Sequence, residues 1–568
     1  MNYLKRTLFL ACLLISCLSF AQNRQPFVET VGLKNKWADA IFKKMSRRER
    51  IAQLFMVRAH TNKGQAFEDS IAKVIQKPRV GGLVFFQGGP GRQAALINRY
   101  QSLSKIPLLI AMDGEWGLGM RLDSTISYPY QMTLGAIQNN QLIYEMGKQI
   151  ASDFKRLGMH VNFAPDVDIN NNPKNPVIGF RSFGDDKYNV TVKAGAYMKG
   201  LQDEGILVSL KHFPGHGDTD VDSHLDLPQL LFDRKRLDSL ELYPFRELIK
   251  QNASGIMTAH IHIPAIDSTA HLPVTLSKPA ITGVLKGELG FKGLVFSDAM
   301  EMKGVVKFFH DGEADVRAII AGNDLVELSQ NTKRAIKLVR KAIRHNRITW
   351  DQINASVKKV LVAKYWLGLD HPKAVSTENV VEDLNDSDAW MLNQCLADAA
   401  VTILKSDSLI KALDFKKSTA IVSLGVVSSS TFQAALKPKF THVETFILPK
   451  DASAVDIASL KSQLKDFDQI IVSIHDMRRR PWSTLDYNSD LKLLIADLAK
   501  MNSILCVFAN PYTFAGLPGI EQCKSILMNY QQSDELEKAS VRVMTGQLKA
   551  SGKLPVTVNS FFKYGDGM

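Results

Sequence analysis

Short apolar runs alternate with longer amphipathic stretches between residues 38 and 370, and this alternation constrains the fold more than any other feature. Most of the apolar runs are followed by Gly, Pro, Asp or His and then by a helix-like segment, such as 141–157 or 333–343. Repeated βα units indicate a parallel sheet, and eight of them predict a (β/α)8 barrel of the TIM type. An open, doubly wound sheet remains the alternative, because periodicity alone does not separate the two. The eight predicted strands are 54–58, 82–86, 108–112, 161–164, 206–210, 255–259, 294–297 and 324–328.

A second domain is expected after the barrel, since 568 residues exceed one ordinary compact core. A helix-rich stretch at 350–366 closes the first unit, which gives a predicted catalytic domain at 30–370. A polar segment at 371–389 is interpreted as a linker. Beyond it, further apolar runs alternate with helical stretches and predict a C-terminal αβα sandwich at 390–568. These runs are 420–424, 469–474, 504–509 and 525–529.

The N-terminus has the pattern of an export signal. Lys5 and Arg6 precede an apolar run at 8–20, which is too short to span a bilayer but fits a signal-peptide core. A cleavage site of the small-x-small kind just before Gln22 predicts a signal peptide at 1–21 and a periplasmic protein. The sequence ending at Cys17 also resembles a lipobox, so an outer-membrane lipoprotein is the alternative. Contact with a membrane is expected only if Cys17 is lipidated.

Composition and charge exclude several classes of protein. A hydrophobic content of 45% is typical of a globular chain and argues against disorder. The formal net charge is +13, but Lys and Arg are spread along the sequence, and the densest run, three arginines at 478–480, is short. Nucleic-acid binding is therefore not expected, whereas attraction to an anionic cell wall is compatible with the charge. Past the predicted signal peptide, the cysteines are too few and too scattered for a disulfide framework: Cys395, Cys506 and Cys523.

Polar residues gather where the predicted strands end. A single Asp after a strand is often only a helix N-cap, but polar residues after five successive strands converge on one face of such a fold. This face is therefore the candidate active site. Its residues are Asp113, Glu115 and Arg121 after the third strand, Asp166, Asp168 and Arg181 after the fourth, the 211–224 loop after the fifth, His260 and His262 after the sixth, and Asp298 after the seventh.

The 211–224 loop allows two interpretations. Imidazole and carboxylate groups suit zinc or iron, so a metal site is one possibility, although the cation of Lys211 would repel a dication. In the other, Asp222 and His224 form an acid/base pair, because residues two apart project to the same side of an extended segment. The carboxylate would fix the imidazole tautomer and leave one nitrogen for proton transfer. We predict the acid/base pair, with no metal and no cofactor. The possible metal ligands are His212, His216, Asp218, Asp220, Asp222 and His224, of which His216 is equally open to a packing role.

The loop and its surroundings also resemble a known family. The motifs are Lys-His-Phe-Pro-Gly-His-Gly-Asp-Thr-x-x-Asp-Ser-His, an earlier Asn-Pro-Val-Ile-Gly-x-Arg-Ser-Phe-Gly and a later Phe-Ser-Asp-Ala-Met. They are similar to the β-N-acetylglucosaminidase branch of glycoside hydrolase family 3. The resemblance covers roughly residues 38–370 and continues more weakly to 552–556. One departure is Trp116, where that family usually has glycine, and a bulky indole there would narrow the site or offer a stacking face.

The resemblance implies an exported, retaining exo-enzyme that removes β-linked N-acetylglucosamine from a glycan, such as peptidoglycan fragments or chito-oligosaccharides. Asp298 matches the nucleophile, and His224 matches the acid/base with Asp222 as its partner. Because a histidine brings no fixed negative charge beside the acceptor, a phosphorylase is the nearest alternative, and a metal-dependent hydrolase is a second. The residues that match those holding the terminal sugar are Asp113, Arg121, Arg181, Lys211 and His212.

Overall fold

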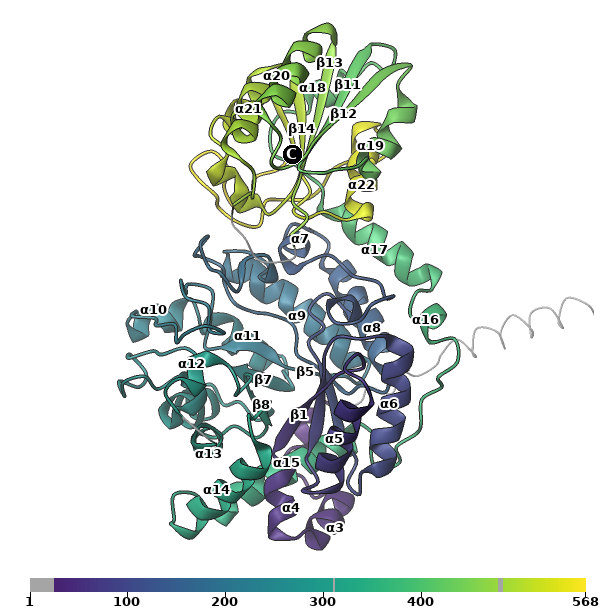
Figure 1. The fold of residues 1–568 in the computed structure, drawn as a ribbon. Coiled ribbons are helices and arrows are strands. Elements are labelled where there is room, and N and C mark those ends of the chain that lie inside the picture. Colours follow the sequence, from purple (N-terminus) through teal and green to yellow (C-terminus); the bar gives the residue numbers. More distant parts are fainter. Residues whose placement is uncertain (1–24, 310–311, 479–483) are drawn as a thin grey trace, which may run out of the picture.

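The computed structural model describes residues 25–309, 312–478 and 484–568 (Figure 1). The predicted signal peptide 1–21, with Cys17 and the cleavage site before Gln22, lies outside these residues, as do Arg479 and Arg480. No helix in the described part of the chain is long and apolar enough to cross a membrane.

The N-terminal half is a closed barrel of parallel strands. Two sheets, ordered β5-β4-β3-β2-β1-β9 and β6-β7-β8, are joined by bridges between Asp166 and Lys211 and between Phe296 and Leu325. Because β9 lies beside β1, the sheet closes on itself, which confirms the predicted barrel and excludes the open sheet. The strands are β1 (Phe55–Ala59), β2 (Gly82–Phe85), β3 (Leu109–Met112), β4 (Val161–Asn162), β5 (Leu207–Val208), β6 (Leu210–Phe213), β7 (Gly255–Thr258), β8 (Leu294–Ser297) and β9 (Val326–Glu327).

Helices cross from one barrel strand to the next and form the outer ring (Figure 1). At the end of the barrel far from the C-terminal domain, α15 (Trp350–Trp366) packs on α3 (Lys36–Lys44) and α4 (Arg47–Ala52). A capping box formed by Ser46 and Glu49 begins α4. The principal crossing helices are α5 (Gln65–Gln76), α6 (Pro90–Leu103), α8 (Asn140–Arg156), α9 (Lys187–Asp203), α11 (Tyr243–Lys250), the π-helix η4 (Pro279–Glu288) and α13 (Glu313–Ala321), and α14 (Thr332–Arg344) follows the last strand.

The fifth predicted strand, 206–210, is two strands in the structure. β5 pairs with β4, whereas β6 pairs with β7, and Ser209 lies between the two segments. The pairing of β6 with β7 is irregular between Leu210 and Phe213. Lys211 and His212 therefore belong to the strand itself rather than to the loop that follows it.

The C-terminal half is an αβα sandwich, as predicted. Its six-stranded sheet has the order β10-β15-β14-β13-β11-β12, in which only β10 is antiparallel to its neighbour. The strands are β10 (Thr402–Ile403), β11 (Ser418–Leu424), β12 (His442–Leu448), β13 (Gln469–His475), β14 (Ser503–Phe508) and β15 (Ser525–Met528). One face is covered by α20 (Ala454–Gln463) and α21 (Ser489–Lys500), and the other by α17 (Ser387–Ala400), α19 (Thr431–Leu436) and α22 (Asp534–Met544) (Figure 1). The predicted linker 371–389 contains α16 (Val380–Asp383) and the first turn of α17.

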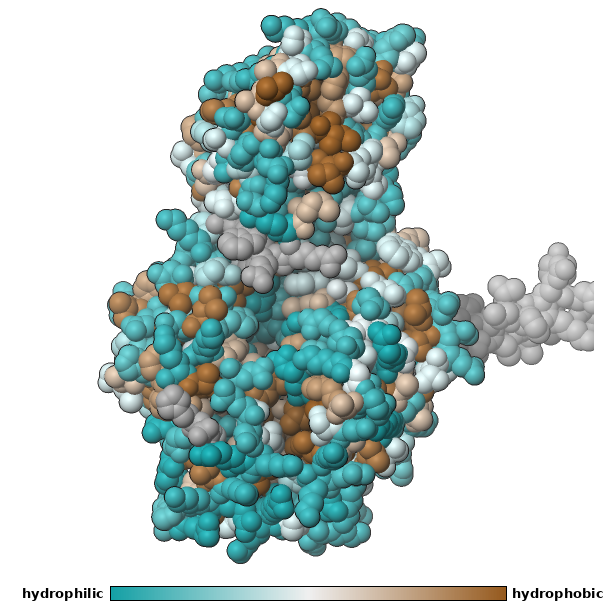
Figure 2. All heavy atoms as spheres, in the orientation of Figure 1, coloured by the Kyte–Doolittle hydropathy of each residue, from teal (hydrophilic) through white to brown (hydrophobic). Residues whose placement is uncertain are grey.

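The two halves meet at loops that follow β3 and β4, and Figure 2 shows a narrow waist between them. The Gln531 side chain accepts hydrogen bonds from Tyr130 N and Thr133 Oγ1, at 2.6 and 2.8 Å. Tyr512 from the C-terminal domain donates to Asn170 O at 2.9 Å. The C-terminal domain therefore braces the same loops that carry the candidate site.

Candidate active site

Five charged side chains, from β6 and from the loops after β3 and β4, form one ion-pair network. Asp113 accepts hydrogen bonds from Arg121 at 2.5 Å and from Lys211 at 2.9 Å. Glu115 lies 2.7 Å from both Lys211 Nζ and Arg181 Nη2. The structure thus brings together four of the five predicted sugar-binding residues and adds Glu115, to which the sequence interpretation gave no role.

The network keeps both carboxylates ionised. Burial raises the pKa of Asp113, but Lys211 and Arg121 outweigh it and hold that pKa well below its usual range. Burial likewise raises the pKa of Glu115, and Arg181 and Lys211 more than reverse the effect. Asp113 is only partly buried, with a side chain 17% exposed, so its lone pairs remain open to hydroxyl donors.

His212, the fifth predicted sugar-binding residue, is fixed in one tautomer. Its Nδ1 lies 2.7 Å from Asp168 Oδ2, and its Nε2 lies 3.4 Å from Arg181 Nη2. Because a guanidinium can only donate, Nε2 accepts, and the protonated Nδ1 donates a hydrogen bond to Asp168. Asp168 also accepts from His216 N at 2.6 Å, so one carboxylate ties β6 to the loop beyond it.

The six possible metal ligands of the 211–224 loop do not converge. His216 is bonded to Thr219 and Ser223, at 2.7 and 3.1 Å, and therefore packs the loop. Within the described ranges, one group brings three metal-ligand side chains together: Asp166, Asp168 and His212. The guanidinium of Arg181 lies 3.8 Å from Asp166 and already supplies a cation to that group.

The predicted acid/base pair is present. His224 Nδ1 lies 2.8 Å from Asp222 Oδ1, so Asp222 engages that nitrogen and not Nε2. The imidazole is 62% exposed. The expectation that the pair occupies an extended segment is wrong. Asp222 opens a turn in which its carbonyl accepts from Leu225 N and Asp226 N, and its carboxylate also accepts from His224 N. The local Asx-type turn, rather than strand alternation, brings the two side chains together.

Asp298 follows β8 and is half-buried, with Oδ1 accepting from Ala299 N at 2.7 Å. Burial raises its pKa, but His260, His212, the Ala299 N–H and His224 together lower it below the usual value. Asp298 is therefore an anion near neutral pH. The loop that carries His224 lies against the segment after Asp298, where Gly304 N donates to Ser223 O at 3.2 Å. The predicted catalytic groups therefore lie on one face of the barrel.

His260 supports Asp298 from β7. Its Nε2 lies 3.0 Å from Ala299 O and its Nδ1 lies 2.9 Å from Thr275 Oγ1. Since a carbonyl only accepts, Nε2 carries a proton. Burial lowers the pKa of His260 against the opposing effect of Asp298. The Thr275 hydroxyl donates to Ala259 O at 2.8 Å and so holds the ring from the backbone of the strand end.

Trp116 lies outside the ion-pair network. Its ring contacts Tyr130 edge-on at 4.8 Å and Phe180 at 6.1 Å between centroids. The indole therefore joins an aromatic cluster at the domain boundary. A cavity of about 150 Å³ beside this cluster is lined by residues of both domains, including Phe180, Asp476 and Asn510.

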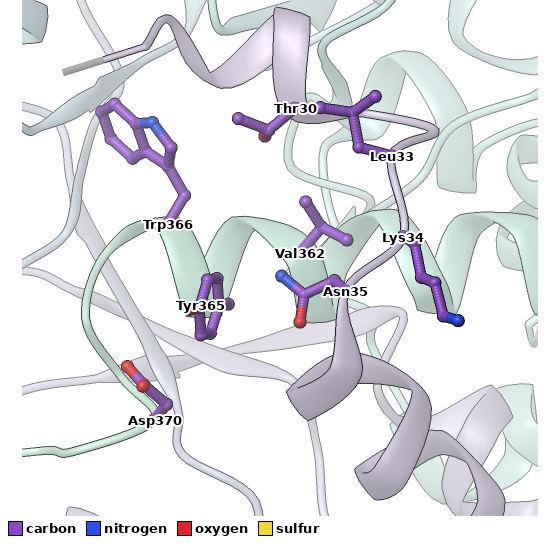
Figure 3. Close-up of a pocket in the computed structure, with 8 residues that line it drawn as sticks. All are labelled: Thr30, Leu33, Lys34, Asn35, Val362, Tyr365, Trp366 and Asp370. Atoms are coloured by element: carbon purple, nitrogen blue, oxygen red, sulfur yellow. The ribbon is translucent and has the colours of Figure 1, made fainter.

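A larger pocket of about 400 Å³ lies against the last turns of α15 (Figure 3). It brings no strand end and no pair of carboxylates into one place, so it is not a candidate active site. Its lining residues are Thr30, Leu33, Lys34, Asn35, Val362, Tyr365, Trp366 and Asp370.

The chain is similar in sequence to known glycosidases. Beta-hexosaminidase A of Pseudoalteromonas piscicida is 32% identical over 377 residues, which span 61% of this chain and 62% of that protein, less than two thirds of its length. A beta-N-acetylglucosaminidase/beta-glucosidase of Cellulomonas fimi is 26% identical over 565 residues, 92% of this chain and 95% of that one.

A solved glycosidase structure is similar to this protein over nearly the whole chain. The glycoside hydrolase family 3 beta-N-acetylglucosaminidase from Paenibacillus sp. str. FPU-7 superposes with a TM-score of 0.77 and 31% identity, covering 91% of this chain and 99% of that chain. Residues 46–363, more than half of the sequence, match the family described as Glycosyl hydrolase family 3 N terminal domain. These matches confirm the resemblance carried by the 211–224 loop, and the chain belongs to glycosyl hydrolase family 3.

Proposed function

We propose that this protein is a retaining exo-β-N-acetylglucosaminidase that works through a covalent glycosyl-aspartate. The observation that carries the proposal is the anionic, half-buried carboxylate of Asp298, which interacts electrostatically with His212, His260 and His224. A nucleophile of this reaction must be ionised and must face an acid/base group across the glycosidic bond.

The reaction needs two steps. Asp298 attacks the anomeric carbon while the imidazolium of His224 gives its Nε2 proton to the departing oxygen, so the glycosidic bond breaks as the ester bond forms. Neutral His224 then takes a proton from water, whose oxygen attacks the same carbon and releases Asp298. The hydrogen bond to Asp222, 2.8 Å from Nδ1, orients the ring and stabilises its protonated form.

The names of the similar proteins support N-acetylglucosamine as the sugar, since beta-hexosaminidase or beta-N-acetylglucosaminidase describes each of the three. In the site, the donors of Lys211, Arg181 and Arg121 surround the acceptors of Asp113 and Glu115. This arrangement suits an uncharged ring that carries several hydroxyl groups. We take peptidoglycan fragments as the first natural substrate and chito-oligosaccharides as the second.

Export is part of the proposal and rests on Lys5, Arg6 and the apolar run at 8–20. The mature protein would then begin at Gln22 in the periplasm, or at a lipidated Cys17 on the outer membrane. Mass spectrometry of the native protein separates these outcomes: a first residue Gln22 supports simple cleavage, a diacylated Cys17 supports the lipoprotein, and an intact Met1 contradicts export.

The activity is tested with a panel of aryl β-glycosides, each assayed with and without phosphate and EDTA. We expect kcat/KM for the N-acetylglucosaminide to exceed that for the glucoside, with no effect of EDTA. Equal values for the two sugars would contradict the sugar assignment. Release of a sugar 1-phosphate in the phosphate arm would show a phosphorylase, and loss of activity with EDTA that zinc restores would show a metal-dependent hydrolase.

A further inference from the structure

Glu327 is a buried carboxyl group that the proposed mechanism does not use. It ends β9, the strand that closes the barrel between β1 and β8. Its N–H donates to Ser297 Oγ at 2.9 Å, and its carbonyl accepts from Met300 N at 3.0 Å. Both peptide groups of Glu327 are therefore bonded to residues that flank Asp298, which fixes its position relative to the proposed nucleophile.

The side chain of Glu327 lacks the partners that a buried anion needs. The residue is 3% exposed, and its Oε1 has no hydrogen-bond partner among the described residues. Lys211, whose charge acts on Glu327, is already paired with Asp113 and Glu115. A buried carboxylate without a paired cation is costly, so this environment favours the neutral acid over the anion.

The electrostatics agree with this geometry. Burial raises the pKa of Glu327 well above its usual range, Asp113 and Asp298 raise it further, and Lys211 only partly opposes them. Other charged residues lie on the elements packed against β9. Arg58 on β1 is paired with Glu301, and Asp315 lies on α13.

We propose that Glu327 is a further sugar-binding residue, whose carboxyl group both donates a hydrogen bond to and accepts one from a single ring hydroxyl between Asp113 and Asp298. This inference rests on the proposed glycosidase function. Asp113 can only accept and Lys211 can only donate, whereas a protonated carboxyl group matches a hydroxyl in both directions. A neutral group also adds no second negative charge beside Asp298, which must stay ionised to attack.

The test combines variants of Glu327 with deoxy substrates. Glu327→Gln keeps a donor and an acceptor and should stay within about tenfold of the wild type in kcat/KM, whereas Glu327→Met should lose about 10- to 100-fold. Aryl N-acetylglucosaminides lacking the 3-, 4- or 6-hydroxyl are then compared. For one position, removal of the hydroxyl should cost the wild type about tenfold or more and cost Glu327→Met almost nothing further.

Asp315→Asn is the matched control, because Asp315 is also 3% exposed, carries an oxygen without a partner and lies outside the site. It should leave the preference among the deoxy substrates unchanged. If Glu327→Met stays as sensitive as the wild type at all three positions, or if Asp315→Asn reproduces its loss, the assignment is wrong.

Two readouts separate this inference from the proposed function. The infrared difference between the wild type and Glu327→Gln at pH 7 should contain the C=O band of a protonated carboxylic acid, and its absence would overturn the proposal whatever the activity. Calorimetric titration with N-acetylglucosamine and its deoxy analogues should show the same coupling without turnover. A wild type that hydrolyses no N-acetylglucosaminide would instead refute the proposed function.

Discussion

At the scale of single residues, the two proposed catalytic groups lie in different environments. Asp298 is half-buried and receives a backbone N–H at 2.7 Å, so its charge is held by the protein. His224 is 62% exposed and depends on one carboxylate, that of Asp222. An exposed imidazole exchanges protons with solvent readily, which suits a group that must act first as acid and then as base.

This difference predicts different defects for the two residues. Asp298→Ala should abolish turnover of every substrate, because no glycosyl-enzyme forms. His224→Ala should retain the first step with a dinitrophenyl glycoside, whose leaving group needs little protonation. The second step still needs a base, so the intermediate should accumulate and appear as a burst. Added azide needs no base and should restore turnover as a β-glycosyl azide.

Asp222→Asn supplies the intermediate case, since it keeps the imidazole but loses the group that stabilises its protonated form. Its kcat should fall between those of the wild type and His224→Ala. The intact-protein mass after reaction with a fluoroglycosyl donor locates the label. Label on a peptide lacking Asp298, or turnover by Asp298→Ala near the wild-type rate, would show that another residue is the nucleophile.

The sequence predicted most of these residues because polar groups after parallel strands meet on one face. Glu327 was not predicted as a site residue, because it lies within the predicted strand 324–328, where a single charged residue gives no periodic signal. Its raised pKa comes first from burial and then from Asp113 and Asp298, which are distant in sequence. Glu115 was visible beside Asp113, but its pairing with Arg181 required the folded loop after β4.

At the scale of elements, close backbone contacts position the loop that carries the Asp222–His224 pair. At Gly217 an added Cβ would lie 1.7 Å from Ile169 O in the loop after β4. At Gly304, in α12 (Lys303–Val306), it would lie 2.9 Å from Ser223 O. Gly304 N donates to that same oxygen at 3.2 Å. The loop is thus docked on the helix that follows Asp298, and only glycine allows the approach.

Gly304→Ala should therefore move the acid/base pair without unfolding the barrel. We expect kcat/KM to fall about 10- to 100-fold for substrates with poor leaving groups, because a displacement of about 1 Å misaligns proton transfer. A dinitrophenyl glycoside should be affected less in its first step. Equal losses for both substrate classes, or a fall in Tm large enough to explain the activity, would assign Gly304 a purely structural role.

The elements themselves were predictable to different degrees. Each of the eight predicted strands overlaps a barrel strand of the structure, because buried parallel strands are continuous apolar runs. In the C-terminal sheet, β12 was missed because it is an edge strand with mostly partly exposed residues, and β10 because it has only two residues. The break between β5 and β6 was not predicted, since it arises from pairing with two different neighbours.

At the scale of the whole molecule, the contact of α8 with α17 joins the barrel to the C-terminal domain around a buried acid, Asp153. Burial raises the pKa of Asp153 to about 7, with Asp386 adding to the effect and a hydrogen bond from Gln149 opposing it. In the unfolded chain the same group titrates near its ordinary value of ~3.9. The folded state therefore binds the proton more tightly, and stability is lost as the pH rises from about 4 to 7.

Asp153→Asn removes this titration while keeping an oxygen that can accept from Gln149. Its Tm should exceed that of the wild type, and the gain should be larger at pH 8 than at pH 5. The reason is that the wild type is fully destabilised only at a pH where the buried carboxyl group ionises. Thermal unfolding at the two pH values measures the difference. A gain that is the same at both pH values, or larger at pH 5, would show that Asp153 is not the titrating group.

The C-terminal domain should support the site rather than take part in the chemistry, and two of its buried residues separate these roles. Tyr512 contacts the loop after β4, where its hydroxyl donates to Asn170 O and accepts from Asn170 Nδ2 at 3.0 Å, two residues beyond Asp168. Tyr512→Phe leaves both Asn170 groups unpaired, which should cost about 1–3 kcal/mol of stability and lower kcat/KM through the loop that holds His212.

His475 ends β13 but is 1% exposed and stacks on Phe508, so no substrate reaches it. His475→Ala should therefore destabilise the domain yet keep kcat within about tenfold, when both variants are assayed well below their Tm. A loss of kcat above about a hundredfold in folded His475→Ala, which is the scale expected of an acid/base group, would assign this domain a catalytic role.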